Sequence, residues 1–420
     1  MPRSAGPQPH VVVVSSLFPS CRQPGAGLFV RERVFRVGRR MPLAVVAPTP
    51  WFPMQRFVGR LWPGFRPGAP RHESQQSRDV WFPRFFSVPA VLKRLDGIAM
   101  ALGAFSRLKR LKNQGRLDVI DAHFGFPDGY AAGLLGRWLD VPVTITMRGT
   151  EQRHAADPVL RGYLRSALLR ADRVFAVSES LRQVAISLGI DPQKVRVVGN
   201  GVDLDRFHPV AQQPAREQIG LAPADRVLIS VGGLVERKGF HRVIECLPQL
   251  RQEFPTLKYL VVGGPSPEGD WTEQLKTLSH SLGLDECVRF LGPVAADDLH
   301  RVLSAAEVFV LATRNEGWAN VFLEAMACGL PVVTTDVGGN REVVSADALG
   351  ELVPFGDKDQ LLSAIRRALS RPWDKGLLRG HAEANTWDRR IDVLESEFRQ
   401  LHREVRASRP AAPIPSTPAR

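Results

Sequence analysis

Two carboxylates, Glu316 and Glu324, stand eight positions apart in a stretch whose residue types suit a phosphorylated ligand. A helix beginning near Trp318 would present backbone N–H groups at its positive end, where a phosphate oxygen can bind beside Glu316. Glu324, a little over two helical turns further on, could hold a pair of hydroxyls such as a ribose diol. An ordinary solvated helix charge is the weaker interpretation of Glu324, because apolar residues surround it. The candidate binding residues of this stretch are Glu316, Gly317, Trp318, Ala319, Asn320, Val321 and Glu324.

A glycine-containing loop follows a strand-like run and precedes an apolar periodic segment, Phe240–Leu250, that is predicted to be a helix. Gly232 and Gly233 would let the backbone approach a ligand closely. Arg237 and Lys238 could neutralise a diphosphate leaving group. Taken alone, the loop is explained equally well as a tight turn with two solvated cations.

Polar residues also follow predicted strands in the first half of the chain. A neutral imidazole at His123 could hydrogen-bond a sugar hydroxyl or orient an acceptor, although a lone histidine is usually structural. Arg148 could contact a phosphate of a ligand, and the competing interpretation is a salt bridge to Glu151. A loop with Gly25 and Gly27 could shape the acceptor side.

The elements that must position these residues alternate between strand-like apolar runs and amphipathic segments of helix length. This alternation predicts an α/β protein with parallel sheets, whose ligands bind at the carboxyl ends of the strands. Five strands are expected in each half of the chain. They are Val11–Ser15, Leu43–Ala47, Val119–Ala122, Val143–Met147, Val174–Val177, Val227–Val231, Tyr259–Val262, Val288–Leu291, Val308–Ala312 and Val332–Thr335.

Two similar open sheets indicate two doubly wound, Rossmann-like domains that face each other. An Asn-Gly turn signal at Asn200-Gly201 marks the join, so we predict an amino-terminal domain over 1–203 and a second domain over 204–385. The segment 406–420 is rich in Pro, Ala, Ser and Arg and is expected to be disordered.

The composition is that of a globular protein, with 420 residues of which 44% are hydrophobic and 24% charged. No apolar run approaches the roughly 18 residues that a membrane span needs. The run Val11–Val14 is too short for the core of a secretory leader, so a cytoplasmic protein is expected. The four cysteines lie far apart with no CxxC pair, which predicts neither a zinc site nor a disulfide framework.

The positive charge is confined to the first half of the chain. Residues 1–200 contain 30 Lys and Arg against 13 Asp and Glu, whereas residues 201–420 contain 26 against 30. A one-sided positive surface indicates a polyanionic partner, such as nucleic acid, an anionic membrane face or a phosphorylated substrate.

The segment Val91–Leu111 combines an apolar stripe, including Leu95, Ile98 and Leu102, with a basic opposite face. A basic amphipathic helix of this kind can lie on an anionic membrane surface. Packing of the stripe on the protein's own sheet is at least as good an interpretation. Nearby aromatic residues favour the membrane, because aromatic rings suit the interface. They are Trp81, Phe82, Phe85 and Phe86.

The segment Glu316–Pro331 resembles the E-x7-E signature of retaining glycosyltransferases of family 4, which adopt the GT-B fold of two facing Rossmann-like domains. The glycine loop with Lys238 and the turn Val198–Asp203 occur in the family's order, and the resemblance spans Val11–Arg403. The segment Ser15–Glu32 is similar to bacterial enzymes of teichuronic acid and exopolysaccharide biosynthesis.

The resemblance implies roles for individual residues. Glu316 would contact the donor sugar hydroxyls, and Glu324 the nucleotide ribose. Lys238 and Arg237 would bind the diphosphate, and His123 would contact the transferred sugar near C6, so the implied catalytic residues are Glu316, His123 and Lys238. Many relatives place an arginine directly after the first glycine of the loop, where this chain has Gly233. Arg237 or Arg148 is expected to compensate.

The resemblance further implies a metal-independent reaction without a cofactor. A hexose-type sugar would move from a UDP- or GDP-linked donor, with retention, to a glycan or polyprenyl-diphosphate-linked acceptor in cell-surface polysaccharide biosynthesis. The basic half would then make the protein peripheral on the inner membrane face. A carboxy-terminal helix over 386–405 would cross back to the first domain.

Other functions are left open at this point. A nucleotide-sugar epimerase or a glycan synthase could use the same fold. Specific binding of nucleic acid is not expected, because beyond the charge no motif of the usual DNA or RNA modules is present.

Overall fold

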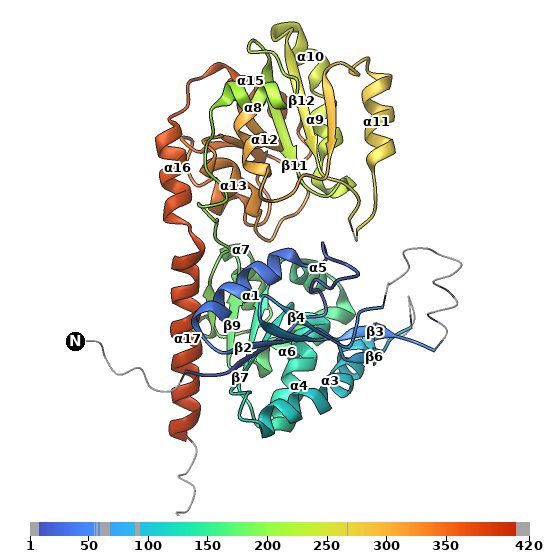
Figure 1. The fold of residues 1–420 in the computed structure, drawn as a ribbon, viewed down its shortest axis with the longest axis vertical. Coiled ribbons are helices and arrows are strands. Elements are labelled where there is room, and N and C mark those ends of the chain that lie inside the picture. Colours follow the sequence, from blue (N-terminus) through green and yellow to red (C-terminus); the bar gives the residue numbers. More distant parts are fainter. Residues whose placement is uncertain are drawn as a thin grey trace, which may run out of the picture. The chain divides into compact units, whose positions relative to one another are not determined.

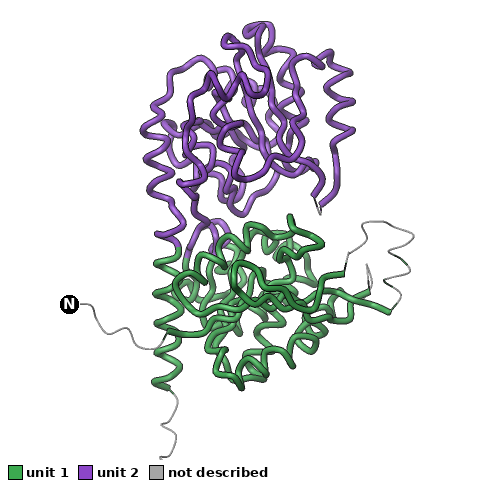
Figure 2. Tube along the Cα trace, in the orientation of Figure 1, with its two compact units in different colours: residues 1–175, 184–196, 391–420 green, residues 176–183, 197–390 purple. Residues whose placement is uncertain are grey.

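The structure is a computed structural model that describes residues 8–53, 55, 58, 68–88, 93–266 and 268–408. The chain forms two compact units (Figure 2). Unit 1 consists of residues 1–175, 184–196 and 391–420, and unit 2 of residues 176–183 and 197–390. Each unit is built on a sheet with helices packed against it (Figure 1), parallel throughout in unit 2 and parallel in unit 1 except for the edge strand β4, which confirms the predicted architecture of two Rossmann-like domains.

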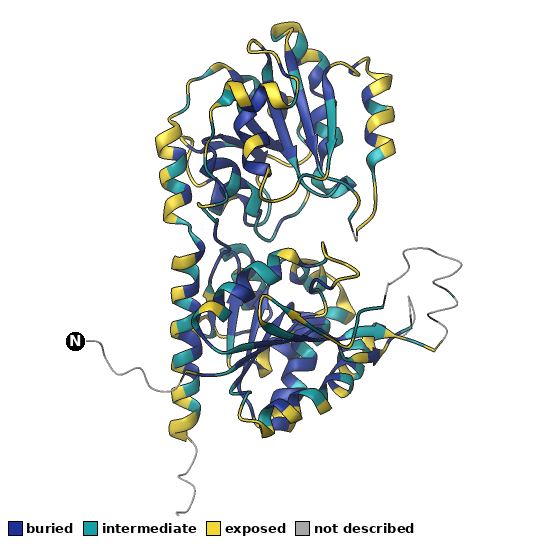
Figure 3. Cartoon of the chain, viewed as in Figure 1, coloured by how far each residue is buried: buried dark blue, intermediate teal, exposed yellow. Residues whose placement is uncertain are grey.

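Unit 1 contains an eight-stranded sheet in the order β10-β9-β8-β7-β1-β2-β5-β4. Its central strand β1 pairs in parallel with β2 on one side and β7 on the other. The four valines of β1 are buried, because helices cover both faces of the sheet. Figure 3 shows the buried strands in dark blue. The strands are β1 (Val11–Val14), β2 (Leu43–Val46), β4 (His72–Gln75), β5 (Arg78–Trp81), β7 (Val119–His123), β8 (Val143–Met147), β9 (Arg173–Ala176) and β10 (Val195–Val197), with β3 (Thr49–Trp51) and β6 (Arg84–Phe86) in a separate pair.

The longer helices of this part of the chain follow the strands in turn. They are α1 (Leu28–Arg40), α3 (Asp96–Asn113), α4 (Tyr130–Leu139), α5 (Thr150–Ala156), α6 (Pro158–Arg170) and α7 (Glu179–Ser187). Helix α7 begins in unit 2 and ends in unit 1.

Unit 2 contains a six-stranded sheet in the order β13-β12-β11-β14-β15-β16, in which the neighbouring strands run parallel. The strands are β11 (Arg226–Val231), β12 (Leu257–Val262), β13 (Val288–Gly292), β14 (Val308–Leu311), β15 (Val332–Thr335) and β16 (Gly350–Val353). The helices are α8 (Gln212–Gln218), α9 (Phe240–Ile244), α10 (Leu247–Glu253), α11 (Thr272–Ser281), α12 (Leu299–Ala305), α13 (Asn320–Ala327), α14 (Asn340–Val343), α15 (Lys358–Ser370) and α16 (Lys375–Ala384).

All ten predicted strands are present, with ends that differ by one or two residues. The single helix predicted over Phe240–Leu250 is wrong, because the chain forms α9 and α10 with a break between them. Pro248 explains the break: it has no N–H, and its ring would clash with the carbonyl of Ile244, where α9 ends.

Helix α17 (Trp387–Ser408) starts in unit 2, and its residues from Ile391 onward belong to unit 1. Phe398 packs edge-on against Phe175 of β9 with ring centroids 6.0 Å apart. The guanidinium of Arg173 lies 2.7 Å from the carboxylate of Glu404. The carboxy-terminal helix therefore returns to the first unit, as predicted. Residues 406–408 of the predicted tail continue α17, and residues 409–420 lie outside the described residues.

Candidate active site

In unit 2, the carboxylate of Glu316 collects three donors from the loops after β11 and β14. Its Oε1 accepts hydrogen bonds from Nζ of Lys238 at 2.6 Å, from Oγ1 of Thr313 at 3.1 Å and from Nη1 of Arg237 at 3.3 Å. Glu316 is buried, whereas Lys238 and Arg237 are partly exposed. The sequence therefore places two cations and a carboxylate together at the carboxyl end of a parallel sheet, where ligands of such folds bind.

Arg237 is held in a fixed orientation. It donates to the carbonyl of Asn315 at 2.7 Å, and its Nε and Nη2 each lie 2.8 Å from one carboxylate oxygen of Glu268. Burial disfavours the charged guanidinium, but the hydrogen bond that Arg237 donates to Glu268 and the charge of Glu316 outweigh it, so the pKa of Arg237 is raised. Arg237 is thus a permanent cation beside Lys238.

Glycines allow the loops of this cluster to pack closely. Gly338, with a φ of +54°, lies so near the Glu316 backbone that a Cβ would come within 1.8 Å of the Glu316 carbonyl oxygen. The N–H of Gly339 donates to that same carbonyl at 3.2 Å. The turn Val337–Asn340 therefore supports the loop that carries Glu316.

The absence of an arginine after Gly232 has a steric reason. A Cβ at Gly233 would lie 2.9 Å from Cβ of Ser266, so an arginine there would require the turn at Ser266 to move. Arg237 is the residue that supplies a second cation beside Lys238. That Arg237 compensates for Gly233 in binding a diphosphate stays a prediction.

The rest of the double-glutamate segment leads into α13. Helix α13 begins at Asn320 rather than Trp318, and its N-cap, Ala319, has no side chain that could cap it. Gly317 and Val321 flank this start, and the indole of Trp318 packs against Gly199. The amide of Asn200 donates to the Asn320 side chain at 2.8 Å.

Glu324 lies within a helix, α13, as the sequence predicted, and is half-buried. Its neighbours Leu323, Ala325, Met326 and Ala327 are fully buried.

In unit 1, His123 ends β7 and is completely buried. Its Nδ1 accepts from Nε and Nη2 of Arg148 at 3.0 and 2.8 Å, and its Nε2 lies 3.3 Å from the carboxylate of Asp121. Burial, together with the positive charge of Arg148, lowers the pKa of His123 to about 4. The ring is therefore neutral at pH 7.

Arg148 ends up against His123 because Glu151 shapes the loop that follows β8. The Glu151 carboxylate accepts from the backbone N–H groups of Gly125, Arg148 and Gly149 at 2.8–2.9 Å. These contacts join Glu151 to the backbone of Arg148, while the Arg148 guanidinium binds the histidine, so they do not bear out the competing interpretation of an Arg148–Glu151 salt bridge. Glu151 is fully buried and ties the loops after β7 and β8 together.

The glycine loop after β1 is structured by a buried carboxyl. Asp128 accepts hydrogen bonds from the backbone N–H and the hydroxyl of Ser16, and burial raises its pKa to about 7. Gly27, with a φ of +69°, lies against the carbonyl of Leu17, which leaves no room for a side chain. Gly25 is exposed and open.

The structure thus gathers the candidates into two groups, each within one unit. His123 and Arg148 are in direct contact in unit 1, and Glu316, Lys238 and Arg237 are in direct contact in unit 2. Sequence analysis did not find Thr313, Glu268 or Asp128. A polar residue directly after a buried strand is a signal for Thr313, whereas Glu268 and Asp128 lie in turns that give none.

Two Asp-x-Asp sequences, Asp203–Asp205 and Asp357–Asp359, could in principle hold a divalent cation. In both, the first aspartate accepts hydrogen bonds from nearby backbone N–H groups and so serves as a local cap. Within the described residues, no group of three His, Cys, Asp or Glu side chains is arranged to bind a metal. Metal independence stays a prediction.

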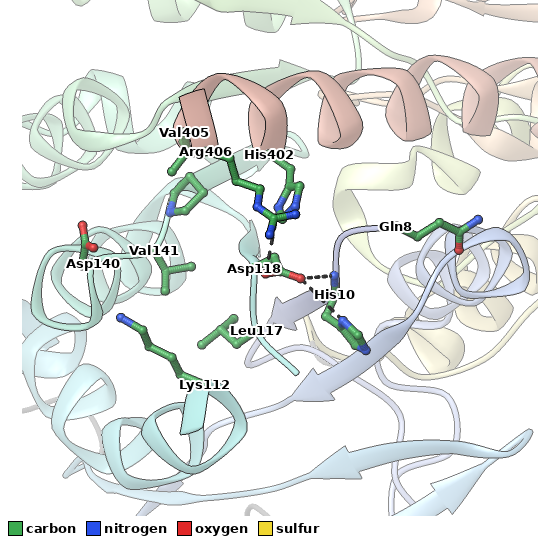
Figure 4. Close-up of a pocket in the computed structure, with 11 residues that line it drawn as sticks. Gln8, His10, Lys112, Leu117, Asp118, Asp140, Val141, His402, Val405 and Arg406 are labelled. Carbon is green, nitrogen blue, oxygen red and sulfur yellow. Dashed lines mark hydrogen bonds and ion pairs between the residues drawn. The ribbon is translucent and has the colours of Figure 1, made fainter. Parts of the chain in front are cut away.

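A cavity of about 380 Å³ lies at the amino ends of the unit 1 strands (Figure 4). Its lining includes His10 and Asp118, which precede β1 and β7, and His402 of α17. Asp118 accepts from the backbone N–H of His10 at 2.8 Å, and Nδ1 of His402 lies 4.0 Å from it. Because it is at the amino ends of the strands, this cavity is separate from the His123–Arg148 pair and marks where α17 meets the sheet.

Comparison with known proteins identifies the family. Residues 211–384 match the family described as glycosyl transferases group 1, and residues 58–206 match glycosyltransferase family 4. The D-inositol 3-phosphate glycosyltransferase of Mycobacterium marinum is 30% identical over 328 residues, which are 74% of this chain and 69% of that protein. The chain belongs to the group 1 glycosyltransferases, with a family 4 amino-terminal region.

Other relatives of this glycosyltransferase are similar over a shorter length. The D-inositol 3-phosphate glycosyltransferase of Geodermatophilus obscurus is 36% identical over 257 residues, or 59% of this chain and 56% of that protein. The enzyme of the same name from Saccharomonospora viridis is matched over 51% of its length. The chain therefore spans little more than half the length of these two relatives. Their name differs from the predicted teichuronic acid and exopolysaccharide enzymes, so the comparisons support only the coarser family assignment.

Solved structures share the fold. Sucrose-phosphate synthase from Thermosynechococcus elongatus aligns with a TM-score of 0.74 at 21% identity, covering 94% of this chain and all of that one. HepE from Anabaena, solved in complex with UDP-glucose, aligns with a TM-score of 0.64 at 20% identity over 95% of this chain and 99% of that one. These likenesses confirm the GT-B fold of the glycosyltransferase. Among its described residues, no helix has the length and apolar character needed to cross a bilayer.

Proposed function

We propose that the protein transfers a hexose-type sugar from a UDP- or GDP-linked donor, with retention of the anomeric configuration, to an acceptor that carries phosphate. The observation that carries this proposal is the convergence of Lys238, Arg237 and Thr313 on one oxygen of Glu316. The cations suit a diphosphate whose negative charge grows as the bond to the sugar breaks, and the carboxylate suits the sugar hydroxyls.

The donor half of the proposal extends along α13. Backbone N–H groups at the start of this helix, by Ala319 and Asn320, can bind a phosphate oxygen. Glu324, half-buried and further along the helix, suits the ribose hydroxyls. HepE, a protein of the same fold, binds UDP-glucose according to the description of its structure. The departing diphosphate would take the acceptor proton on the face from which it leaves.

A phosphate-bearing acceptor is supported by the first half of the chain. This half has a large excess of Lys and Arg, and Arg148 lies at the carboxyl end of β8. The relatives described above are named for inositol 3-phosphate, and the resemblance to cell-surface polysaccharide enzymes suggests a polyprenyl-diphosphate-linked glycan. Both acceptor classes carry phosphate. We propose inositol 3-phosphate as the acceptor and the polyprenyl-diphosphate-linked glycan as the alternative.

The test is transfer of radiolabelled sugar from UDP- and GDP-linked donors to inositol 3-phosphate and, separately, to a polyprenyl-diphosphate-linked sugar. NMR of the product reports the anomeric configuration. One donor family should react, with retention, and Glu316→Gln should abolish the product while the thermal midpoint stays near that of the wild type. Release of altered free sugar without any acceptor would instead indicate an epimerase. Wild-type turnover by Glu316→Gln would overturn the site assignment.

A further inference from the structure

Helix α3 of unit 1 has two apolar faces, and only one of them packs against the protein. The inner face is formed by residues that are completely or almost completely buried. These residues are Met100, Ala101, Ala104, Leu108 and Leu111. A helix that packs against a core needs one buried apolar stripe, and this inner face alone supplies it.

The second face points outward. Leu95, just ahead of the helix, is 49% exposed, Ile98 is 39% exposed and Leu102 is 64% exposed. Phe86 of β6, 54% exposed, joins them, and together they line a cavity of about 200 Å³ with Val88. The interpretation that this stripe packs on the protein's own sheet is therefore wrong for these residues. The aromatic argument for a membrane is also corrected, because Trp81, Phe82 and Phe85 are buried.

An exposed tryptophan extends this surface along the helix. Trp138 of α4 is 43% exposed and packs edge-on against Phe105, with ring centroids 5.9 Å apart. The ammonium of Lys109 lies 5.8 Å from the Phe105 ring. A partly exposed indole suits the boundary between lipid tails and headgroups. We refer to Phe86, Leu95, Ile98, Leu102 and Trp138 as the outer patch.

The charges around the outer patch are almost all positive. Asp96 is the only acidic residue of α3, and Lys93 lies 3.2 Å from its carboxylate. From Gly97 to Leu117 the sequence has no Asp or Glu. The exposed basic residues of β6, of the turn Lys93–Leu95, of α3 and of α4 are Arg84, Arg94, Lys109, Arg110 and Arg137, against one exposed acidic residue, Asp140, directly after α4.

This charge distribution distinguishes between possible occupants. A second copy of the chain docked through the same face would bring basic residues against basic residues, which is unfavourable. A water-facing role would leave several large apolar side chains and an indole exposed together, which soluble surfaces rarely do. An anionic bilayer would bury the apolar patch at its acyl chains and attract the surrounding basic residues with its headgroups.

We propose that the outer patch docks unit 1 onto an anionic lipid bilayer. Leu95, Ile98, Leu102 and Phe86 enter the boundary of the acyl chains, Trp138 lies at headgroup depth, and Lys109 and Arg110 contact lipid phosphates. Docking does not depend on the proposed glycosyl transfer, because it uses neither Glu316 nor His123 and is measured without any sugar donor.

The test is co-sedimentation of the full chain with phosphatidylcholine vesicles that contain or lack phosphatidylglycerol, at low and at high salt. We expect binding to the anionic vesicles that weakens with salt. Leu102→Gln should lower the partition coefficient by on the order of tenfold. Leu377→Gln is the matched control, since Leu377 is 45% exposed on α16 of unit 2, and it should bind like the wild type.

A local probe separates insertion from general electrostatic attraction. With the exposed Cys21 replaced by serine, Leu102→Cys and Leu377→Cys each carry one accessible thiol for an environment-sensitive dye, because the other three cysteines are buried. The dye at position 102 should shift to the blue on anionic vesicles, and the dye at 377 should not. No binding to anionic vesicles at low salt, or equal binding by Leu102→Gln, would overturn the proposal. So would a vesicle-independent dimer that Leu102→Gln abolishes, since it would assign the patch to a second copy.

Discussion

Nζ of Lys238 lies 2.6 Å from Oε1 of Glu316, although 78 positions separate the two residues in the chain. The contact exists because β11 and β14 are neighbouring parallel strands, so the loops that follow them start side by side at the carboxyl end of the sheet. Lys238 is positioned by the short turn Glu236–Lys238 and Glu316 by its contacts with Thr313 and the Gly338 turn. The candidate donor site is thus built into the sheet rather than into one loop.

Glu316→Gln keeps the shape of the side chain and removes its charge. We expect kcat for glycosyl transfer to fall by on the order of 10²-fold or more, because hydroxyl binding and the ordering of Lys238 both depend on the carboxylate. Steady-state kinetics with the reactive donor check this. Glu268→Gln is the comparison. The pair of Glu268 with Arg237 is partly exposed, so its loss should cost little stability, and kcat should fall less than in Glu316→Gln. An equal loss of kcat in both variants would show that Glu316 has no special role.

Gly338→Ala should displace the backbone that carries Glu316. A Cβ there would come within 1.8 Å of the Glu316 carbonyl oxygen, and the backbone has a φ of +54°. We expect a loss of more than about 2 kcal/mol in the free energy of unfolding, together with weaker nucleotide binding. Gly380→Ala is the control, because nothing lies within 4 Å of its Cβ position in helix α16. Urea unfolding of the two variants distinguishes a local steric effect from a general effect of losing a glycine.

Asp128 should make stability fall as the pH rises. Its pKa is raised to about 7 by burial, above the value near 3.9 of an unfolded aspartate, so the folded chain binds the extra proton between these values. Its contribution is present in acid and is lost as the pH rises from about 4 through 7. The wild type should therefore lose stability between pH 5 and pH 8, whereas Asp128→Asn should not. The stability of the variant minus that of the wild type should thus be greater at pH 8 than at pH 5. Thermal midpoints of both proteins at these pH values are the measurement, and parallel pH profiles would contradict the assignment.

His123 should have the opposite effect. Its pKa is lowered to about 4, below the value near 6.5 of an unfolded histidine, so the unfolded chain binds more protons between these values. Stability should fall as the pH is lowered from about 6.5 to 4, and His123→Asn should flatten this part of the profile. Urea midpoints at pH 7 and pH 5 test it. If the wild type lost no more stability than His123→Asn over this interval, the ring would not be buried in its neutral form.

The sequence was sufficient for ten of the fourteen described strands in the two sheets, and it marked Lys238 and Glu316 as candidates for one site. Continuous apolar runs such as Val11–Val14 identify strands that are covered on both faces. The strands it missed are short or polar. In the β4–β5 hairpin, Gln76 and Ser77 adopt φ values of +49° and +61°, a turn conformation usually signalled by Asn or Gly.

Other features depend on contacts that a single sequence does not display. The burial of His123 beneath Arg148 and the raised pKa of Asp128 arise from residues distant in the chain. The outward face of α3 was not distinguishable from the inward one, because Leu102 and Leu108 both fit an apolar helical period while only Leu108 is buried. Periodicity identifies apolar faces but does not say which of two faces has a partner.

Calorimetric titration of UDP and GDP into the wild type and into Lys238→Met tests the central claim, that these loops hold the diphosphate of a nucleotide sugar. We predict that one of the two nucleotides binds the wild type and that Lys238→Met weakens its affinity by on the order of tenfold or more, since it removes a charge-assisted contact. Binding of neither nucleotide, or equal affinity for both proteins, would contradict the account.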